Sequence, residues 1–196
     1  MNSPELAIRS AEVRDAAPIA AIYAPYVPET AVSFETEPPT TQVMAERIGD
    51  TLRTHPWLVA TRGDDIMGYA YAGKHRTRAA YRWSADVTVY VDRSMRRNGV
   101  GRALYRVLLE TLRRQGFRSA FAEIVMPNPG SRRLHEATGF EQIGLYKDVG
   151  FKLGCWRDIE YWRLSLADGA APPSELIPFA EFRETSTFTD VLRHGG

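Results

Sequence analysis

A short glycine-rich segment, Arg96–Arg102, has the residue types and spacing of an anion-binding loop. It lies between a run of β-branched and aromatic residues that ends at Val91 and an amphipathic run that begins at Val100. Gly99 and Gly101 let the backbone approach a ligand closely or adopt positive φ. The unpaired amides of a helix's first turn attract anions. Three side chains add positive charge around these amides: Arg96, Arg97 and Arg102.

The spacing of the loop distinguishes it from two other phosphate-binding motifs. It lacks the Lys-Ser/Thr pair of a P-loop, and its glycines do not follow the dinucleotide pattern G-x-G-x-x-G. The pattern is instead Arg-x-x-Gly-x-Gly. Because an ordinary strand-to-helix turn has the same outline, the loop alone is a weak signal, and its surroundings decide.

Two elements must hold this loop in place. Ala85–Val91 is strongly β-prone, and Val100–Arg114 has the periodicity of an amphipathic helix that stops at Gly116. Four residues form the apolar face of that helix: Leu104, Val107, Leu108 and Leu112.

The remaining chain alternates between strand and helix patterns. Strands are expected at Leu6–Arg9, Trp57–Thr61, Ile66–Gly73, Ala120–Val125, Phe140–Tyr146 and Asp158–Leu166, with a short extended piece at Val32–Phe34. Helices are expected after an Asp15 cap, after Thr40 or Thr41, and over Ser131–Ala137. This order predicts an α/β (mixed α+β) domain over residues 1–166, a mixed sheet with helices on its faces. Residues 167–196 are expected to form a C-terminal extension that is either packed on this domain or partly disordered.

Composition excludes several functional classes. The 196 residues fit one domain, and a net charge of +1 gives no global attraction to nucleic acid or an anionic membrane. A lone cysteine, Cys155, excludes an intrachain disulfide and a multi-cysteine zinc site. No secretory h-region or membrane-spanning apolar run is present. We therefore expect a cytoplasmic protein with no metal and neither nucleic-acid nor membrane partners.

The loop, placed after Val-Tyr-Val, resembles the acetyl-CoA pyrophosphate loop of the GNAT superfamily of N-acetyltransferases. Further segments narrow the resemblance to the phosphinothricin acetyltransferase family, from about Leu6 to Leu166. These segments, in order, are Val32–Pro38, Pro56–Ala60, Ala70–Gly73, Thr88–Val91, Leu134–Ala137 with Gly139 and Phe140, and Trp156–Asp158 with Trp162.

The resemblance implies a GNAT fold, whose twisted and mostly antiparallel sheet splays between its fourth and fifth strands. Acetyl-CoA would lie in that gap, between the strands ending at Val91 and Val125. Its pantetheine arm would pair with main chain, its pyrophosphate would meet loop amides, and an asparagine would bind its amide groups. The cofactor-binding residues implied are Val89, Tyr90, Val91, Arg96, Arg97, Asn98, Gly99, Val100, Gly101, Arg102 and Asn128.

Amine acetylation needs a general base, because an ammonium has no lone pair with which to attack. The family has glutamate at the position of Asp86, whose shorter side chain favours a bridging water. His135 matches a family histidine, and the ordinary histidine pKa of about 6.5 suits a base at neutral pH. Both are candidate catalytic residues, with Asp86 slightly ahead. Cys155 is a bystander, because the thioester is already activated.

The resemblance also implies a small amine acceptor, with L-phosphinothricin first. This amino acid presents two anionic groups. Arg78 could bind one of them through two parallel hydrogen bonds, and tyrosine hydroxyls could donate the remaining bonds. The positions that match the family's substrate pocket are Phe34, Tyr71, Arg78, Tyr81 and Tyr90.

Other interpretations remain open at this stage. The acceptor could be methionine sulfoximine, another small amine or a protein N-terminus. A non-catalytic acyl-CoA sensor would keep the loop and lack a working base, which the Asp86 departure allows. The resemblance also implies a homodimer, with the C-terminal segments as its contact region.

Overall fold

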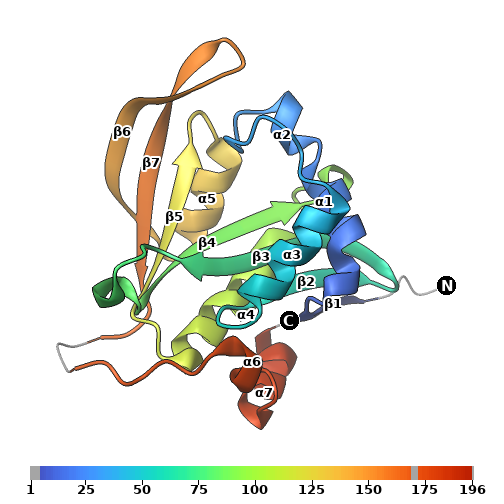
Figure 1. Ribbon diagram of the computed structural model, residues 1–196, viewed down its shortest axis with the longest axis vertical. Helices are drawn as coiled ribbons and strands as arrows, with labels where there is room; N and C mark the ends of the chain where they lie inside the picture. The colour runs from blue at the N-terminus through green and yellow to red at the C-terminus, as the bar shows by residue number, and fades with distance from the viewer. Residues whose placement is uncertain (1–4, 169–171, 196) are drawn as a thin grey trace.

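The computed structural model describes residues 5–168 and 172–195, and a single mixed sheet organises them (Figure 1). Its seven strands lie in the order β1-β2-β3-β4-β5-β7-β6, and every neighbouring pair is antiparallel except β4 and β5. The strands are β1 (Leu6–Ser10), β2 (Trp57–Arg62), β3 (Asp65–Lys74), β4 (Ser84–Val91), β5 (Ser119–Val125), β6 (Glu141–Lys152) and β7 (Cys155–Ser165).

Helices cover both faces of this sheet. They are α1 (Ala16–Tyr23), α2 (Tyr26–Glu29), α3 (Thr41–Thr51), α4 (Val100–Gln115), α5 (Pro129–Ala137), α6 (Phe179–Phe182) and α7 (Ser186–Gly195). Gly101 of α4 lies close to the side chains of Val89 and Val91 on one face of β4. On the opposite face, the rings of Tyr23 and Tyr26 meet Tyr90 edge-on. The expected layered α/β architecture is therefore confirmed.

The parallel pair β4–β5 is joined over only three residues. Ser84 pairs with Ser119, Ala85 with Ala120 and Asp86 with Phe121. Beyond Asp86 the two strands diverge, as Figure 1 shows. This is the predicted splay between the fourth and fifth strands, and Asp86 marks the point where it opens.

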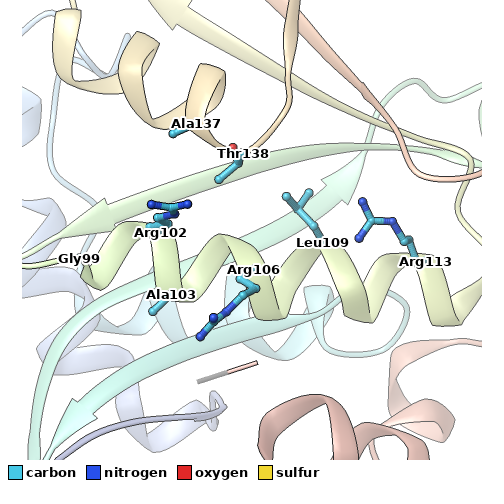
Figure 2. A pocket seen from close by; sticks show the side chains of 8 residues that line it. All are labelled: Gly99, Arg102, Ala103, Arg106, Leu109, Arg113, Ala137 and Thr138. Carbon is cyan, nitrogen blue, oxygen red and sulfur yellow. The ribbon is translucent and has the colours of Figure 1, made fainter. Parts of the chain in front are cut away.

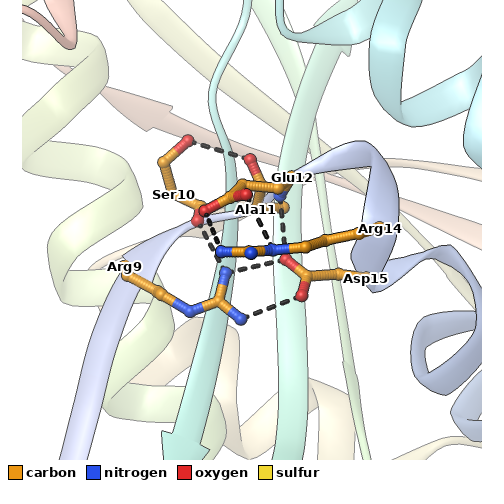
Figure 3. Close-up of polar contacts among 6 residues, drawn as sticks. All are labelled: Arg9, Ser10, Ala11, Glu12, Arg14 and Asp15. Atoms are coloured by element: carbon orange, nitrogen blue, oxygen red, sulfur yellow. Dashed lines mark hydrogen bonds and ion pairs between the residues drawn. The ribbon is translucent and has the colours of Figure 1, made fainter.

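The start of α1 differs from the sequence prediction. Asp15 makes no side-chain cap on α1. Instead its carboxylate receives both terminal nitrogens of Arg9, at 2.7 and 2.9 Å, and the Glu12 amide at 2.8 Å (Figure 3). Burial favours the neutral acid, but the Arg9 and Glu12 bonds outweigh it and lower the pKa of Asp15. Asp15 therefore ties β1 to the following turn.

Other boundaries also moved. Val32 and Ser33 form bends rather than an extended piece, because Ser33 is bonded through its hydroxyl to Tyr23 and through its carbonyl to Lys152. A separate short helix, α2, follows α1 and contains Pro28. Thr40, one of the two expected caps, accepts a bond from the Val43 amide at 3.2 Å.

The last two strands are longer than predicted, and they form a hairpin that projects from the body of the molecule (Figure 1). β6 continues six residues past Tyr146, and β7 begins three residues before Asp158. Leu153 and Gly154 turn the chain with φ values of 53° and 74°. Much of this hairpin is exposed on both faces, so a hydrophobic alternation pattern did not mark its length.

The C-terminal extension packs against the domain. Phe179, Phe182 and Phe188 are each at most 4% exposed and belong to the main hydrophobic cluster. Gln115, at the end of α4, donates to the Ile177 carbonyl at 2.8 Å and accepts the Ile177 amide on its own carbonyl at 3.0 Å. The extension therefore contributes to the core.

Candidate active site

The glycine-rich loop is built with backbone geometry that favours glycine. A 3-10 turn at Arg93–Met95 leads into it, and φ is positive at Arg97 (66°) and Gly99 (79°). Few non-glycine residues adopt this conformation, and such residues gather at functional sites. Gly99 is the N-cap of α4 and supplies no side-chain cap, so the first-turn amides of α4 have no capping side chain. An anion site at these amides stays a prediction that the backbone of the loop allows.

Side chains of α2 contact the end of β4 and the arginines that follow it. The Tyr26 hydroxyl donates to the Val91 carbonyl at 2.6 Å, which fixes the end of β4. The guanidinium groups of Arg93 and Arg96 lie over the Tyr26 ring, and Arg93 also pairs with Glu29. These contacts hold the strand end and the loop in register.

A cleft of about 510 Å³ runs from the loop along α4 toward the end of α5 (Figure 2). Arginine side chains of α4 lie along it, and the end of α5 closes its other side. Its lining residues are Gly99, Arg102, Ala103, Arg106, Leu109, Arg113, Ala137 and Thr138. Such a positively charged groove suits an extended anionic ligand.

A second, smaller hollow lies where β4 and β5 diverge. Main-chain and side-chain atoms of both strands line it, together with Tyr105, Asn128, Ser131 and His135. Asn128 uses its Oδ1 to cap α5 by accepting the Ser131 amide at 3.1 Å. Of the predicted residues, the structure therefore brings Val89, Tyr90, Asn128 and His135 to one hollow.

His135 lines this hollow but is almost fully buried. It is 3% exposed, its Nδ1 lies 2.8 Å from the Ser131 carbonyl, and its Nε2 lies 3.1 Å from the Tyr105 hydroxyl. Burial lowers the pKa of His135, and the bond to Ser131 opposes that only in part. The ring is therefore neutral at pH 7, with both nitrogens engaged.

Asp86 has a different environment. Its side chain is 40% exposed, and its Oδ1 lies 2.6 Å from Nδ1 of His75. Burial raises the pKa of Asp86, and the His75 bond lowers it in part. The structure does not join Asp86 to His135. The carboxylate has a partner that the sequence did not reveal, because His75 reaches it only through the pairing of β3 with β4.

The predicted substrate residues lie in three places. Tyr71 and Tyr90 belong to a row of rings on the α1 face of the sheet: Trp57 stacks on Tyr71 at 4.3 Å, and Tyr90 meets Tyr23 at 4.9 Å. Burial raises the pKa of Tyr90 well above its usual value, so its phenol is neutral. Tyr71 and Tyr90 therefore form part of an aromatic wall.

Arg78 and Tyr81 lie on the exposed loop between β3 and β4, in and before the 3-10 turn Ala79–Tyr81. The Tyr81 ring approaches His75 edge-on, with ring centroids 5.9 Å apart. This loop therefore lies beside Asp86 and carries an exposed arginine.

Phe34 is 38% exposed, and its ring lies over Gly150 of the hairpin. Lys152, also on the hairpin, is 8% exposed and donates to the carbonyls of Ser33 and Glu35, the latter at 2.6 Å. Glu35 in turn receives Arg47 through both carboxylate oxygens, at 2.8 and 3.0 Å. Sequence reasoning missed this anchor, because more than a hundred residues separate Lys152 from the loop that it fixes.

Residues 8–161 match the profile of the acetyltransferase (GNAT) domain. The chain is a GNAT acetyltransferase. Among characterised relatives, it is 37% identical to phosphinothricin N-acetyltransferase of Streptomyces viridochromogenes, over 91% of this chain and 99% of that protein. It is also 32% identical to L-methionine sulfoximine/L-methionine sulfone acetyltransferase of Salmonella typhimurium, over 85% and 98% of the two chains.

Solved structures support the same assignment. The GNAT acetyltransferase aligns with a phosphinothricin acetyltransferase from Sinorhizobium meliloti in complex with acetyl-CoA at a TM-score of 0.84 and 33% identity, over 91% and 99% of the chains. A putative acetyltransferase from Salmonella typhimurium, solved with acetyl-CoA, aligns at a TM-score of 0.81 and 32% identity, over 85% and 97%. In the described part of this acetyltransferase, no helix is long and apolar enough to cross a membrane. The same residues contain no group of three or more acidic, histidine or cysteine side chains suited to a metal ion.

Proposed function

We propose that this GNAT acetyltransferase transfers the acetyl group of acetyl-CoA to the amino group of a small amino-acid analogue, with L-phosphinothricin as the leading acceptor. The observation that carries the proposal is the position of Asp86. Asp86 stands at the last paired step of β4 and β5, and its side chain lies on the sheet face that carries Tyr71 and Tyr90. A base in that position can meet an amine beside a thioester.

The residues present fit acetyl-CoA as co-substrate. Loop residues Arg97–Arg102 offer first-turn amides and positive charge for a pyrophosphate, and Val89–Val91 offer main-chain groups that no strand of the described chain pairs on the β5 side. Arg96 and Asn98 lie in the same loop, and Asn128 lies at the far wall of the splay. The solved complexes of two relatives with acetyl-CoA support this placement.

The chain's own groups supply what the reaction needs. Asp86 takes the amine proton directly or through one water, so the neutral amine can attack the acetyl carbon. Amides on β4 beyond Asp86 stabilise the oxyanion that forms. The departing thiolate needs a proton or a local positive potential. No covalent acyl-enzyme is required, so the exposed Cys155 has no part in transfer.

The acceptor class follows from the walls of the site. Tyr71 and Tyr90 present apolar faces, and Phe34 closes the side next to the hairpin. Arg78, with Tyr81 beside it, is placed on the loop next to Asp86 and suits a carboxylate or phosphinate. The relatives named for phosphinothricin and for methionine sulfoximine support an amino-acid analogue as substrate.

A thiol-release assay with acetyl-CoA and a panel of amines tests this proposal. The panel contains L-phosphinothricin, methionine sulfoximine, a simple alkylamine and a peptide with a free N-terminus. We expect turnover with at least one amino-acid analogue and the highest kcat/KM for L-phosphinothricin. If activity is highest on methionine sulfoximine, the proposed acceptor is wrong but the proposed acetyl transfer stands. Acetyl-CoA binding without any turnover would favour a sensor.

The proposal includes a homodimer in the cytoplasm. Apolar side chains cluster on the exposed hairpin, a pattern typical of protein interfaces: Ile143, Leu145, Tyr146, Val149, Phe151, Leu153 and Trp156. A lone, exposed Cys155 fits a reducing compartment. Light scattering should give twice the mass of one chain, and Trp156→Ser should shift the measured mass toward that of a single chain. A wild-type monomer at all concentrations would contradict the dimer.

A further inference from the structure

The carboxylate of Asp86 has a dedicated partner. Nδ1 of His75 lies 2.6 Å from Asp86 Oδ1, and the His75 side chain is only 12% exposed whereas that of Asp86 is 40% exposed. One oxygen of the carboxylate is therefore hydrogen-bonded to a mostly buried imidazole ring. The carboxylate itself remains accessible.

The pairing of three strands creates this contact. Gly73 of β3 pairs with Asp86 and Lys74 with Ala85, so His75 follows diagonally on the face that carries the Asp86 side chain. The imidazole stacks on Phe121 of β5, with centroids 4.2 Å apart and planes at 14°. Phe121 is also the residue that pairs with Asp86 across the last joined step of β4 and β5. The ring is therefore fixed at the point where the splay opens.

We propose that His75 is the positioning residue of the catalytic base: its Nδ1–H donates to Asp86 Oδ1 and leaves Oδ2 to take the proton of the acceptor amine. The proposal rests on Asp86 being the base of the proposed function. It explains how a short aspartate side chain keeps one orientation. The proton passes from the amine nitrogen, or from a bridging water, to Oδ2, and the imidazole keeps its own proton throughout.

The charges around Asp86 set the pH consequence. Burial raises the pKa of Asp86, the nearby Glu123 carboxylate on β5 raises it further, and His75 and Arg76 lower it. Tyr71 on β3 faces Asp86, and Tyr161 on β7 bonds Glu123. Loss of the His75 donor therefore raises the pKa of Asp86. More of the base is then protonated at a given acidic pH.

The pH profile of kcat/KM for the amine tests the proposal. His75→Phe keeps a ring that can stack on Phe121 but removes the hydrogen-bond donor. His75→Asn loses the ring but keeps an N–H donor on a shorter side chain. We expect His75→Phe to lower kcat about 10- to 100-fold, the usual effect of losing a hydrogen bond to a charged group. Its acidic limb should move to higher pH. His75→Asn should restore part of the rate and return the limb toward its wild-type position.

His55 provides a matched control. It also lies against a phenylalanine, Phe117, at 5.4 Å, and it also bonds through Nδ1, but to the hydroxyl of Thr54 at 2.8 Å. His55→Phe should therefore leave the shape and midpoint of the pH profile unchanged. An acidic limb in His75→Phe at the wild-type position, or an Asn variant as impaired as the Phe variant, would overturn the proposal.

Asp86→Asn separates the two levels of inference. A wild-type rate in Asp86→Asn removes the base assignment itself, and the His75 proposal with it. An impaired Asp86→Asn beside an unaltered His75→Phe overturns the positioning role alone. In the folded wild-type protein, NMR should show a downfield imidazole N–H resonance that Asp86→Asn removes. If the wild-type protein lacks this resonance, the proposed His75–Asp86 hydrogen bond is contradicted, even if the His75 variants fail to fold.

Discussion

At the scale of single residues, a general base needs a free lone pair near neutral pH. The two candidates, Asp86 and His135, stand in different surroundings. His135 is neutral, but Ser131 and Tyr105 occupy its two nitrogens. Asp86 keeps an accessible carboxylate with one engaged oxygen. To act as a base, His135 would first have to release a bond, whereas Asp86 can accept a proton as it stands.

We expect Asp86→Ala to lower kcat about 10²- to 10⁴-fold, the usual effect of losing a general base, with little change in the KM for acetyl-CoA. His135→Gln should mainly lower the melting temperature, because it disturbs a buried ring between Tyr105 and Phe140. Steady-state kinetics and thermal unfolding of both variants measure this. The reverse ranking of kcat losses would assign the base to His135.

At the scale of elements, the hairpin β6–β7 and the loop before α3 act on one another. The Phe34 ring lies where a side chain at position 150 would point, and a Cβ there would come within 2.5 Å of its Cζ. Lys152 holds the backbone of the same loop. The ring at the mouth of the site is thus positioned by a strand far along the chain.

Gly150→Ala should push the Phe34 ring aside and raise the KM for the amine, while the KM for acetyl-CoA stays near wild type. The stability change should be small, because an exposed ring can rotate away. Phe34→Ala in the same chain removes the obstacle, so the double variant should kinetically match Phe34→Ala alone. Additive effects in this double-mutant cycle would show that the two positions act independently.

The sequence predicted those elements whose signals are local. The periodicity of Val100–Arg114 and the glycines at 99 and 116 gave α4 almost to the residue. The His75–Asp86 bond depends on strand register, and the Lys152 anchor spans 117 residues to Glu35. Neither contact has a signature in one chain, since both require knowing which strands are neighbours. The hairpin length was missed because exposed residues interrupt its alternation.

At the scale of the whole molecule, the C-terminal extension connects the core to the substrate loop. Phe179 is fully buried, and its amide donates to the Thr54 carbonyl at 3.1 Å. Upstream, the Trp83 indole donates to the Ser174 carbonyl at 2.8 Å, and Arg82 pairs with Glu175 at 2.9 Å. The extension thus contacts the segment that follows Arg78 and Tyr81.

Phe179→Ala should destabilise the protein by about 3–5 kcal/mol, the usual cost of emptying a buried phenylalanine site. Denaturant unfolding measures this change. Val13→Ala provides the control, because that side chain is 51% exposed and lies outside the hairpin, and its effect on stability should be within about 0.5 kcal/mol. Equal losses would mean that the extension does not contribute to the cooperative core.

The three-residue junction of β4 with β5 also has a consequence for hydrogen exchange. Along a strand, successive backbone amides point alternately to the neighbouring strand on either side. Beyond Asp86, no described strand pairs with the β4 amides that point to the β5 side. In the free protein, deuterium uptake at Val87–Val91 should therefore exceed that of the flanking β3. Acetyl-CoA should slow that uptake before any amine is added, so the opened sheet edge would report cofactor binding independently of turnover.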